Sequence, residues 1–133
     1  MIFVDTSAVV AILAAEADAA TLAAKIDAEP ERISAAHVIL EASMRLATLV
    51  GLPPPVAGSL VTRMLREAGI TVVPITEETA ELSVIAFERY GKGRNNRAGL
   101  NFGDCLSYAC AQLHGARLLF KGNDFVHTDI ARA

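Results

Sequence analysis

The chain has 133 residues, of which 53% are hydrophobic and 20% are charged, and its net charge at pH 7 is −3 with histidine neutral. This composition excludes an intrinsically disordered chain, and the length predicts a single domain over residues 1–133. The charge also excludes a protein that coats nucleic acid through bulk positive charge, so any phosphate binding must depend on local basic patches or on a metal ion.

The first half of the chain predicts two strands, each followed by two helices. In chain order these are a buried strand over 1–4, a helix over 8–15, an alanine-rich helix over 16–28, a short strand over 31–34, a long helix over 35–50, and a helix that starts at 53–55 and stops at 69. Asp5, Thr6 and Ser7 offer N-cap oxygens to the first helix, and Ser34 offers one to the long helix.

The second half predicts a strand over 70–75, a helix over 77–90, an exposed basic loop over 91–99 and a helix over 102–113. A strand over 117–120, a polar turn over 122–124 and a last short strand or turn over 125–130 follow. In the helix over 77–90, Ala80, Val84 and Phe87 are expected to face inward. Short, continuously apolar strands are typical of parallel strands that are covered on both faces. The order of elements therefore predicts an α/β fold with a mainly parallel sheet and helices on both sides.

Nothing in the sequence predicts a membrane segment. No apolar stretch approaches the roughly 18 residues needed to span a bilayer. The first apolar run lacks a basic leader and is followed almost at once by Asp5, which is unlike a secretory signal. We therefore expect a cytoplasmic protein that has no membrane partner.

Four acidic residues stand beside apolar runs that are spread across the whole chain: Asp5, Glu41, Asp104 and Asp124. Carboxylates are costly to bury unless a cation meets them, and parallel α/β sheets place their ligands beyond the carboxyl ends of the strands. Oxygen ligands of this kind suit Mg²⁺ or Mn²⁺, whereas zinc favours histidine or cysteine. A divalent metal on a carboxylate cluster usually meets phosphate, which indicates nuclease-type chemistry.

Asp5 and Asp104 also have structural explanations at helix starts. Asp5 can be the N-cap of the helix that follows it, although Thr6 or Ser7 could take that place and leave the carboxylate free. If Asn101 is the N-cap of its helix, Asp104 stands at the third helical position, where the helix dipole favours an acid. The same positive helix end helps to gather anionic groups around a site, so both explanations remain open.

Glu41 and Asp124 have ordinary alternatives as well. Glu41 can pair with Arg45 one turn later, which contributes only about 0.2–0.5 kcal/mol, but its apolar surroundings would solvate it poorly without a cation. Asp124 stands in a turn, where aspartate commonly forms local hydrogen bonds. Asn123 could be the ligand in its place, and Asp129 is a further acid nearby.

Four segments, taken in order, carry a resemblance to a known family. They are Val4–Ala8, Leu40–Ala42, Tyr90–Arg94 leading into Ala98–Cys105, and Leu118–Phe125 with Thr128–Ile130. Over essentially all 133 residues, the chain resembles the PIN-domain ribonucleases, and specifically the VapC-type toxins of bacterial toxin–antitoxin pairs. The resemblance implies a PIN-like three-layer α/β fold, in which helices flank a short, mainly parallel sheet.

The resemblance also implies an activity and the residues that perform it. The activity is metal-dependent endonucleolytic cleavage of RNA, with Mg²⁺ or Mn²⁺ as the cofactor. Asp5, Glu41 and Asp104 match the core acids of the family, and Asp124 matches its fourth, more variable acid. These four are therefore the expected catalytic and metal-binding residues.

Other residues are expected to contact the substrate. Thr6 or Ser7 would correspond to the small hydroxyl residue that the family has near its metal. Lys92, Arg94 and Arg97 lie in the densest basic segment and could hold the RNA backbone, because phosphate contacts position a nucleic acid without specifying its sequence.

The resemblance implies two protein partners, a second copy in a homodimer and a cognate antitoxin that often places a basic side chain in the acidic pocket. A different class of function remains open, because the chain could be a non-catalytic binding module whose acidic cleft docks a basic segment. Metal-dependent phosphatase chemistry on small phosphates would use the same acids. It is disfavoured because the chain has no glycine-rich phosphate loop that ends in Lys-Ser or Lys-Thr.

Overall fold

A four-stranded parallel sheet forms the centre of the computed structural model, which describes all 133 residues. Its strands are β1 (Ile2–Val4), β2 (Arg32–Ala35), β3 (Thr71–Val73) and β4 (Arg117–Leu119), in the spatial order β3-β2-β1-β4. Phe3 of β1 pairs with Ile33 on one side and with Leu118 on the other. The predicted α/β fold with a mainly parallel sheet is confirmed.

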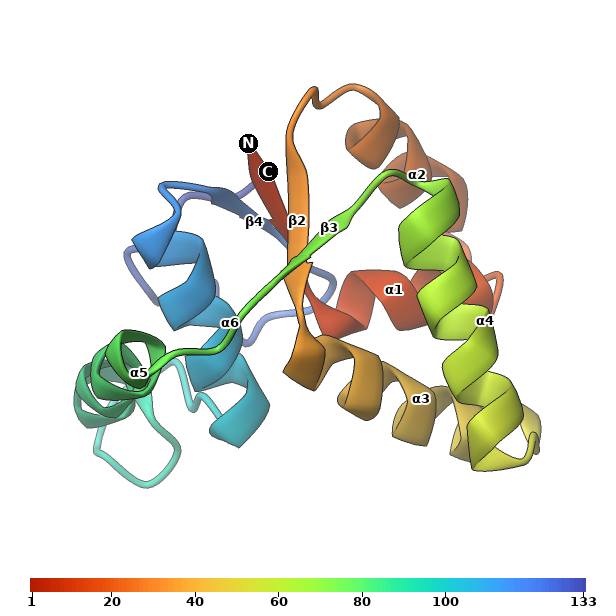
Figure 1. Cartoon of the computed structure of the whole chain (residues 1–133). Coiled ribbons are helices and arrows are strands. Elements are labelled where there is room, and N and C mark those ends of the chain that lie inside the picture. The colour runs from red at the N-terminus through yellow and green to blue at the C-terminus, as the bar shows by residue number, and fades with distance from the viewer.

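Six helices surround the sheet: α1 (Thr6–Leu13), α2 (Ala19–Asp27), α3 (Ala36–Val50), α4 (Pro54–Glu67), α5 (Glu77–Tyr90) and α6 (Phe102–Leu113). Figure 1 shows α5 and α6 on one side of the sheet and α1, α2 and α4 on the other, which gives the three layers that the sequence predicts. None of the helices is both long and apolar enough to cross a membrane.

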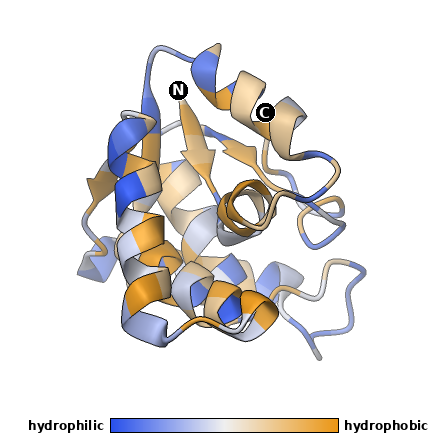
Figure 2. Ribbon diagram, turned by 90° about the vertical axis from the view of Figure 1, so that its right-hand side faces the viewer, coloured by the Kyte–Doolittle hydropathy of each residue, from blue (hydrophilic) through white to orange (hydrophobic).

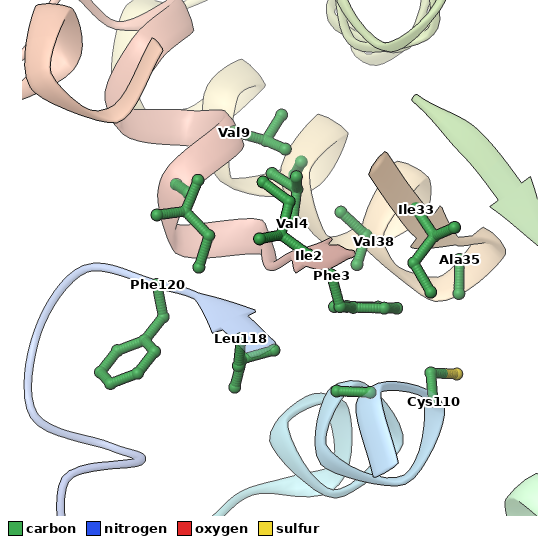
Figure 3. Close-up of a cluster of buried hydrophobic side chains, with 14 of the residues drawn as sticks. Ile2, Phe3, Val4, Val9, Ile33, Ala35, Val38, Cys110, Leu118 and Phe120 are labelled. Carbon is green, nitrogen blue, oxygen red and sulfur yellow. The ribbon is translucent and has the colours of Figure 1, made fainter. Parts of the chain in front are cut away.

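Side chains of β1 alternate between the two faces of the sheet, as the geometry of a strand requires. Figure 3 shows Phe3 pointing toward α6 and Cys110, whereas Ile2 and Val4 point toward α1 and Val9. These side chains belong to one core of 30 buried hydrophobic residues, and Figure 2 shows the central strands in the hydrophobic colour. Burial of each large side chain contributes about 1.5–3 kcal/mol, so the sheet is a rigid base for the residues at its ends.

The carboxyl ends of three strands lead to the predicted acids. β1 passes directly to Asp5, β2 leads into α3 with Glu41, and β4 leads into the turn that contains Asp124. α6, which carries Asp104, packs against β1, β2 and β4. The topology therefore directs all four acids to one end of the sheet, which is where parallel α/β proteins bind their ligands.

The inward orientation predicted for α5 is wrong. Ala80, Val84 and Phe87 are exposed, and the accessible fraction of Val84 is 68%. α5 packs chiefly against α6, and the residues that it buries are Thr79 and Ala86. The apolar stripe of this helix therefore faces away from the core.

Two further expectations differ from the structure. The strand expected over 70–75 is limited to β3, an edge strand on which Val72 is exposed. Ser34 does not cap α3, because its hydroxyl donates to the carbonyl of Val4 at 2.9 Å and Ala35 is the N-cap. The segment over 125–130 is predicted to be a short strand or a turn, and the structure has turns and bends there, with a strand-like bridge between Leu118 of β4 and Arg132 beyond it.

Candidate active site

Asp5 is buried, with 4% of its surface accessible, and hydrogen bonds hold both of its carboxylate oxygens. Oδ2 accepts from the backbone N–H of Ser7 at 3.0 Å and from the Ser7 hydroxyl at 2.7 Å. Oδ1 accepts from the Ser107 hydroxyl at 2.8 Å. Of the alternatives that the sequence leaves open, Asp5 itself is therefore the N-cap of α1, and neither Thr6 nor Ser7 takes that place. Oδ1 still has a lone pair for a ligand, because each carboxylate oxygen offers about two acceptor sites and only Oδ2 uses both.

Asp104 is also buried, with 7% of its surface accessible. Asn101 caps α6 and accepts from the N–H of Asp104 at 2.9 Å, while Oδ2 of Asp104 accepts from the N–H of Asn101 at 3.0 Å. This reciprocal pair is the capping arrangement that the sequence allows. It uses one oxygen of Asp104, and Oδ1 accepts no hydrogen bond from the protein.

The pKa of Asp104 depends on burial and on the charges of the other three acids. Burial raises this pKa to about 7, the hydrogen bond from the Asn101 backbone opposes the rise, and the charges of Asp5, Asp124 and Glu41 add to it. A cation among these carboxylates would favour the charged form of Asp104 again. A cation at this position would therefore relieve part of the cost of burying the Asp104 carboxylate.

Glu41 lies over the start of α6. A Cβ atom at Gly103 would overlap its carboxylate, so only glycine permits this close approach. The pair with Arg45 that the sequence allows does not form, and no other cation pairs with Glu41. By contrast, Lys121 forms ion pairs with both Glu16 and Asp18 at the surface.

Among the three alternatives for the fourth acid, Asp124 and Asp129 have different surroundings. Asp129 accepts from the hydroxyl of Tyr108 at 2.6 Å, which gives it a structural role. Asp124 is exposed, its side chain has no hydrogen bond or ion pair, and its charge acts on Asp104. Asn123 is also exposed, and its side chain has no partner.

The two hydroxyl residues after Asp5 differ sharply. Ser7 bonds to the Asp5 carboxylate and also accepts from the backbone N–H of Lys121 at 3.0 Å, which ties α1 to the end of β4. Thr6 has 1% of its surface accessible, and its hydroxyl has no hydrogen-bond partner. Of the two, Ser7 is the hydroxyl beside a predicted metal ligand.

The basic loop over 91–99 is anchored at its base and exposed along its length. Asn96 donates to a backbone carbonyl at 2.8 Å and accepts from two backbone N–H groups at 2.9 and 3.1 Å. Lys92, Arg94 and Arg97 are exposed and form no ion pairs. Arg94 lies over the ring of Phe87, 5.9 Å from its centre. All three cations are thus free to contact an anionic ligand.

The donor set fits a hard divalent cation, because it consists of carboxylates without a cationic partner. As the side chains stand, no three acidic, histidine or cysteine residues come close enough together to surround one ion. Like charges repel, and Glu41 and Asp124 lack the hydrogen bonds that hold Asp5 and Asp104. Glu41 and Asp124 are therefore the two side chains that no hydrogen bond of the protein holds back from moving toward an ion.

Two polar residues next to Asp5 carry no role in the predictions from sequence. Ser107 is completely buried and bonds to Asp5, and His37 approaches Ser107 with Nε2 at 2.9 Å. Burial lowers the pKa of His37 to about 4, against the opposing charge of Asp5, so the ring is neutral at pH 7. The three-residue spacing from Asp104 to Ser107, which places both on one helix face, is the signal that could have identified Ser107.

Comparison with known proteins gives consistent matches over nearly the full chain. A model of the PIN domain matches residues 2–131. Ribonuclease VapC28 of Mycobacterium tuberculosis is 45% identical over 131 residues, which is 98% of this chain and 96% of the relative.

Two solved structures are similar in fold. VapC20 of Mycobacterium tuberculosis, described as a toxin that cleaves the sarcin–ricin loop, matches with a TM-score of 0.78 and covers 100% of this chain and 98% of its own. A toxin–antitoxin complex from Klebsiella pneumoniae matches with a TM-score of 0.69 over 97% of this chain and 93% of that one. Both are 20% identical in sequence, so they show the fold alone.

Proposed function

This chain belongs to the PIN-domain family, and we propose that it is a metal-dependent endoribonuclease that acts as the toxin of a toxin–antitoxin pair. The observation that carries the proposal is the group of acids at the carboxyl end of the sheet, none of which has a cationic partner. The ribonuclease name of a relative that is 45% identical supports RNA as the substrate.

We propose Asp5, Asp104, Glu41 and Asp124 as the residues that hold Mg²⁺ or Mn²⁺. A cation bound there would supply a water of lowered pKa and would offset negative charge on the phosphate. Asp5 presents its carboxylate in a fixed orientation, because Ser7 and Ser107 donate to its two oxygens. Asp104 is fixed through Oδ2 and presents Oδ1, and Glu41 approaches from α3 across Gly103.

Lys92, Arg94 and Arg97 are proposed to hold the RNA backbone. Their loop begins directly after α5 and ends two residues before α6, whose first turn carries Asp104. A phosphate chain held by these cations would run toward the acids along the start of α6. Such contacts contribute affinity that depends on salt and is independent of sequence.

The antitoxin is proposed to block the acids with a basic side chain, whose charge complements the four carboxylates. Arginine suits this role because its guanidinium can bond to a carboxylate through two N–H groups. The similarity of fold to a chain of a toxin–antitoxin complex is compatible with such a partner.

A second copy of this chain is proposed to cover an apolar groove of about 750 Å³ between α3, α5 and α6. Leu40, Val84, Phe87 and Phe102 line it and are exposed, and no acidic, lysine or arginine side chain contributes to it. An uncharged, aromatic lining matches the interface core of homodimers. Sedimentation equilibrium should give a dimer for the wild type and for a Leu49→Glu control, and a monomer for Val84→Glu; a monomeric wild type would contradict this.

The direct test of the activity is cleavage of total RNA by the purified, antitoxin-free protein. Discrete cuts are expected with Mg²⁺ or Mn²⁺ and no cuts with EDTA. Asp5→Asn is the matched control, because asparagine keeps the N-cap oxygen of α1 and removes the charge. Absence of cleavage by a folded wild-type protein in every metal would reject the enzyme and favour a non-catalytic module that docks a basic segment.

A further inference from the structure

Three polar side chains from three different elements form one chain of hydrogen bonds beside the acids. His37 comes from the first turn of α3, Ser107 from the middle of α6, and Asp5 from the end of β1. His37 Nε2 and Ser107 Oγ are 2.9 Å apart, and Ser107 Oγ lies 2.8 Å from Oδ1 of Asp5. Asp5 and Ser107 are buried, at 4% and 0% accessibility, so water does not compete strongly for these bonds.

The direction of the bonds follows from the number of protons available. An ionised carboxylate only accepts, so the single hydroxyl proton of Ser107 must point to Asp5. Ser107 can then only accept from His37, which means that Nε2 of the imidazole carries a proton. Nδ1 of His37 is buried and has no partner, and in this tautomer it is the nitrogen that lacks the proton.

The hydrogen bond from His37 limits the orientation of the Ser107 hydroxyl, which has a second possible acceptor. A serine inside a helix commonly turns its hydroxyl to the carbonyl four residues earlier, which for Ser107 is that of Gly103. The N–H of His37 holds a lone pair of Ser107 and so directs the hydroxyl proton toward Asp5. The imidazole is itself oriented by Phe3, whose ring stacks on it with 6.2 Å between centres and 13° between planes.

We propose that His37 is a positioning residue, which acts through Ser107 to hold Oδ1 of Asp5 in the orientation that binds the divalent cation. This inference rests on the proposed function, because Asp5 needs a fixed orientation only if it binds a ligand. Groups that support a metal ligand in this way typically change metal affinity by about 10–100-fold when they are removed. His37 stands one hydrogen bond further away than Ser107, so its effect should lie near the lower limit.

The test is a titration with Mn²⁺, followed by calorimetry, of the wild type and four variants. His37→Phe keeps the ring that stacks on Phe3 and removes the N–H, so Mn²⁺ should bind about tenfold more weakly. His37→Gln restores a donor at a similar reach and should recover most of the affinity. Ser107→Ala should weaken Mn²⁺ binding at least as much as His37→Phe. The double variant His37→Phe/Ser107→Ala should bind Mn²⁺ as tightly as Ser107→Ala alone, because His37 acts only through Ser107.

The pattern across the variants distinguishes positioning from a general structural role. Thermal unfolding checks that each variant is folded. Across His37→Phe and His37→Gln, the change in Mn²⁺ affinity should not run parallel to the change in melting temperature. Wild-type affinity in His37→Phe, equal losses in His37→Phe and His37→Gln, or additive losses in the double variant would each overturn the inference. In these cases the wild type still binds Mn²⁺ and cleaves RNA, so the proposed function stands. A wild type that neither binds Mn²⁺ nor cleaves RNA would contradict both the proposed function and the role of His37.

Discussion

The two halves of the acidic site are built differently. Asp5 and Asp104 are buried, and each is fixed by hydrogen bonds at the start of a helix. Glu41 and Asp124 have no hydrogen-bond partner and are more accessible. The buried pair is set when the helices form, because the capping bonds are part of the fold. The other pair has no fixed position, and a ligand must supply the interactions that hold it.

The two pairs of acids therefore differ in the free-energy cost of burying their charge and in their freedom to move. The buried pair carries the cost, which is visible in the raised pKa of Asp104. Part of that cost is offset by the positive ends of α1 and α6, where N–H groups point at the carboxylates. Asp124 is exposed and Glu41 is partly accessible, so both bear less of this cost, and without hydrogen-bond partners they can adjust to a cation and a phosphate.

Loss of charge in the buried half should have the largest effect. Asp5→Asn or Asp104→Asn should lower the rate of RNA cleavage by more than about 100-fold, because loss of a group that merely supports a metal ligand already costs about 10–100-fold. Both substitutions keep the capping oxygens, so thermal unfolding should show little loss of stability. The corresponding change in the other half, Asp124→Asn, should cost less. Equal losses at Asp5 and Asp124 would contradict the distinction between the halves.

Gly103 lies where the two halves meet and offers a smaller, more selective change. Gly103→Ala should displace the Glu41 carboxylate and lower the cleavage rate, by about the tenfold expected for disturbing the surroundings of a metal. Alanine is favoured over glycine inside a helix by about 1 kcal/mol, so the melting temperature should stay the same or rise. On a Glu41→Gln background the substitution should have no further effect, and an undiminished effect there would show that it acts by another route.

The same two halves differ in how well they could be predicted from sequence. The spacing of three residues between Asn101 and Asp104 predicts the capping arrangement of α6 directly, because a cap depends on neighbours in the chain. The bond from Ser107 to Asp5 joins residues 102 positions apart, and the approach of Glu41 to Gly103 depends on how α3 packs. No local pattern contains such contacts, so the acids could be identified and their partners could not.

The orientation of α5 cannot be predicted from the sequence for a related reason. Its apolar residues follow helical periodicity, which identifies an apolar stripe without saying what covers it. Val84 and Phe87 face a groove shared with α3 and α6 instead of the core. A surface that needs a partner has the same pattern as one that faces the interior, so the periodicity alone predicts a core-facing stripe.

The basic loop should affect substrate binding far more than the chemical step. Alanine at Lys92, Arg94 and Arg97 together should raise KM several-fold, leave kcat nearly unchanged, and reduce the salt dependence of RNA binding by about 0.7 per phosphate contact that is lost. Arg66→Ala is a control, because Arg66 is exposed on α4 and forms no ion pair. Binding measured at several salt concentrations gives the slope. A fall in kcat with an unchanged salt dependence of RNA binding would mean that the loop takes part in the chemical step.

The smallest effects should appear in the stability of the metal-free protein, where His37 and Asp104 act with opposite sign. Burial lowers the pKa of His37 to about 4 from an ordinary value of about 6.5, so the unfolded chain binds more protons and stability rises as the pH rises through this range. Burial raises the pKa of Asp104 to about 7 from about 3.9, so the folded chain binds more protons and stability falls as the pH rises. Between pH 4 and 6.5 the two contributions offset each other.

Single substitutions should separate the two contributions. In urea denaturation with EDTA, Asp104→Asn should make the unfolding free energy rise more steeply with pH than in the wild type, because only the falling contribution is lost. His37→Phe should make it fall, since the contribution of Asp104 remains. Addition of Mn²⁺ should remove the fall in His37→Phe, because a cation beside Asp104 restores the preference for its charged form. A slope that Mn²⁺ does not change would mean that the buried carboxylate and the cation site are separate, and the two halves would then not form one site.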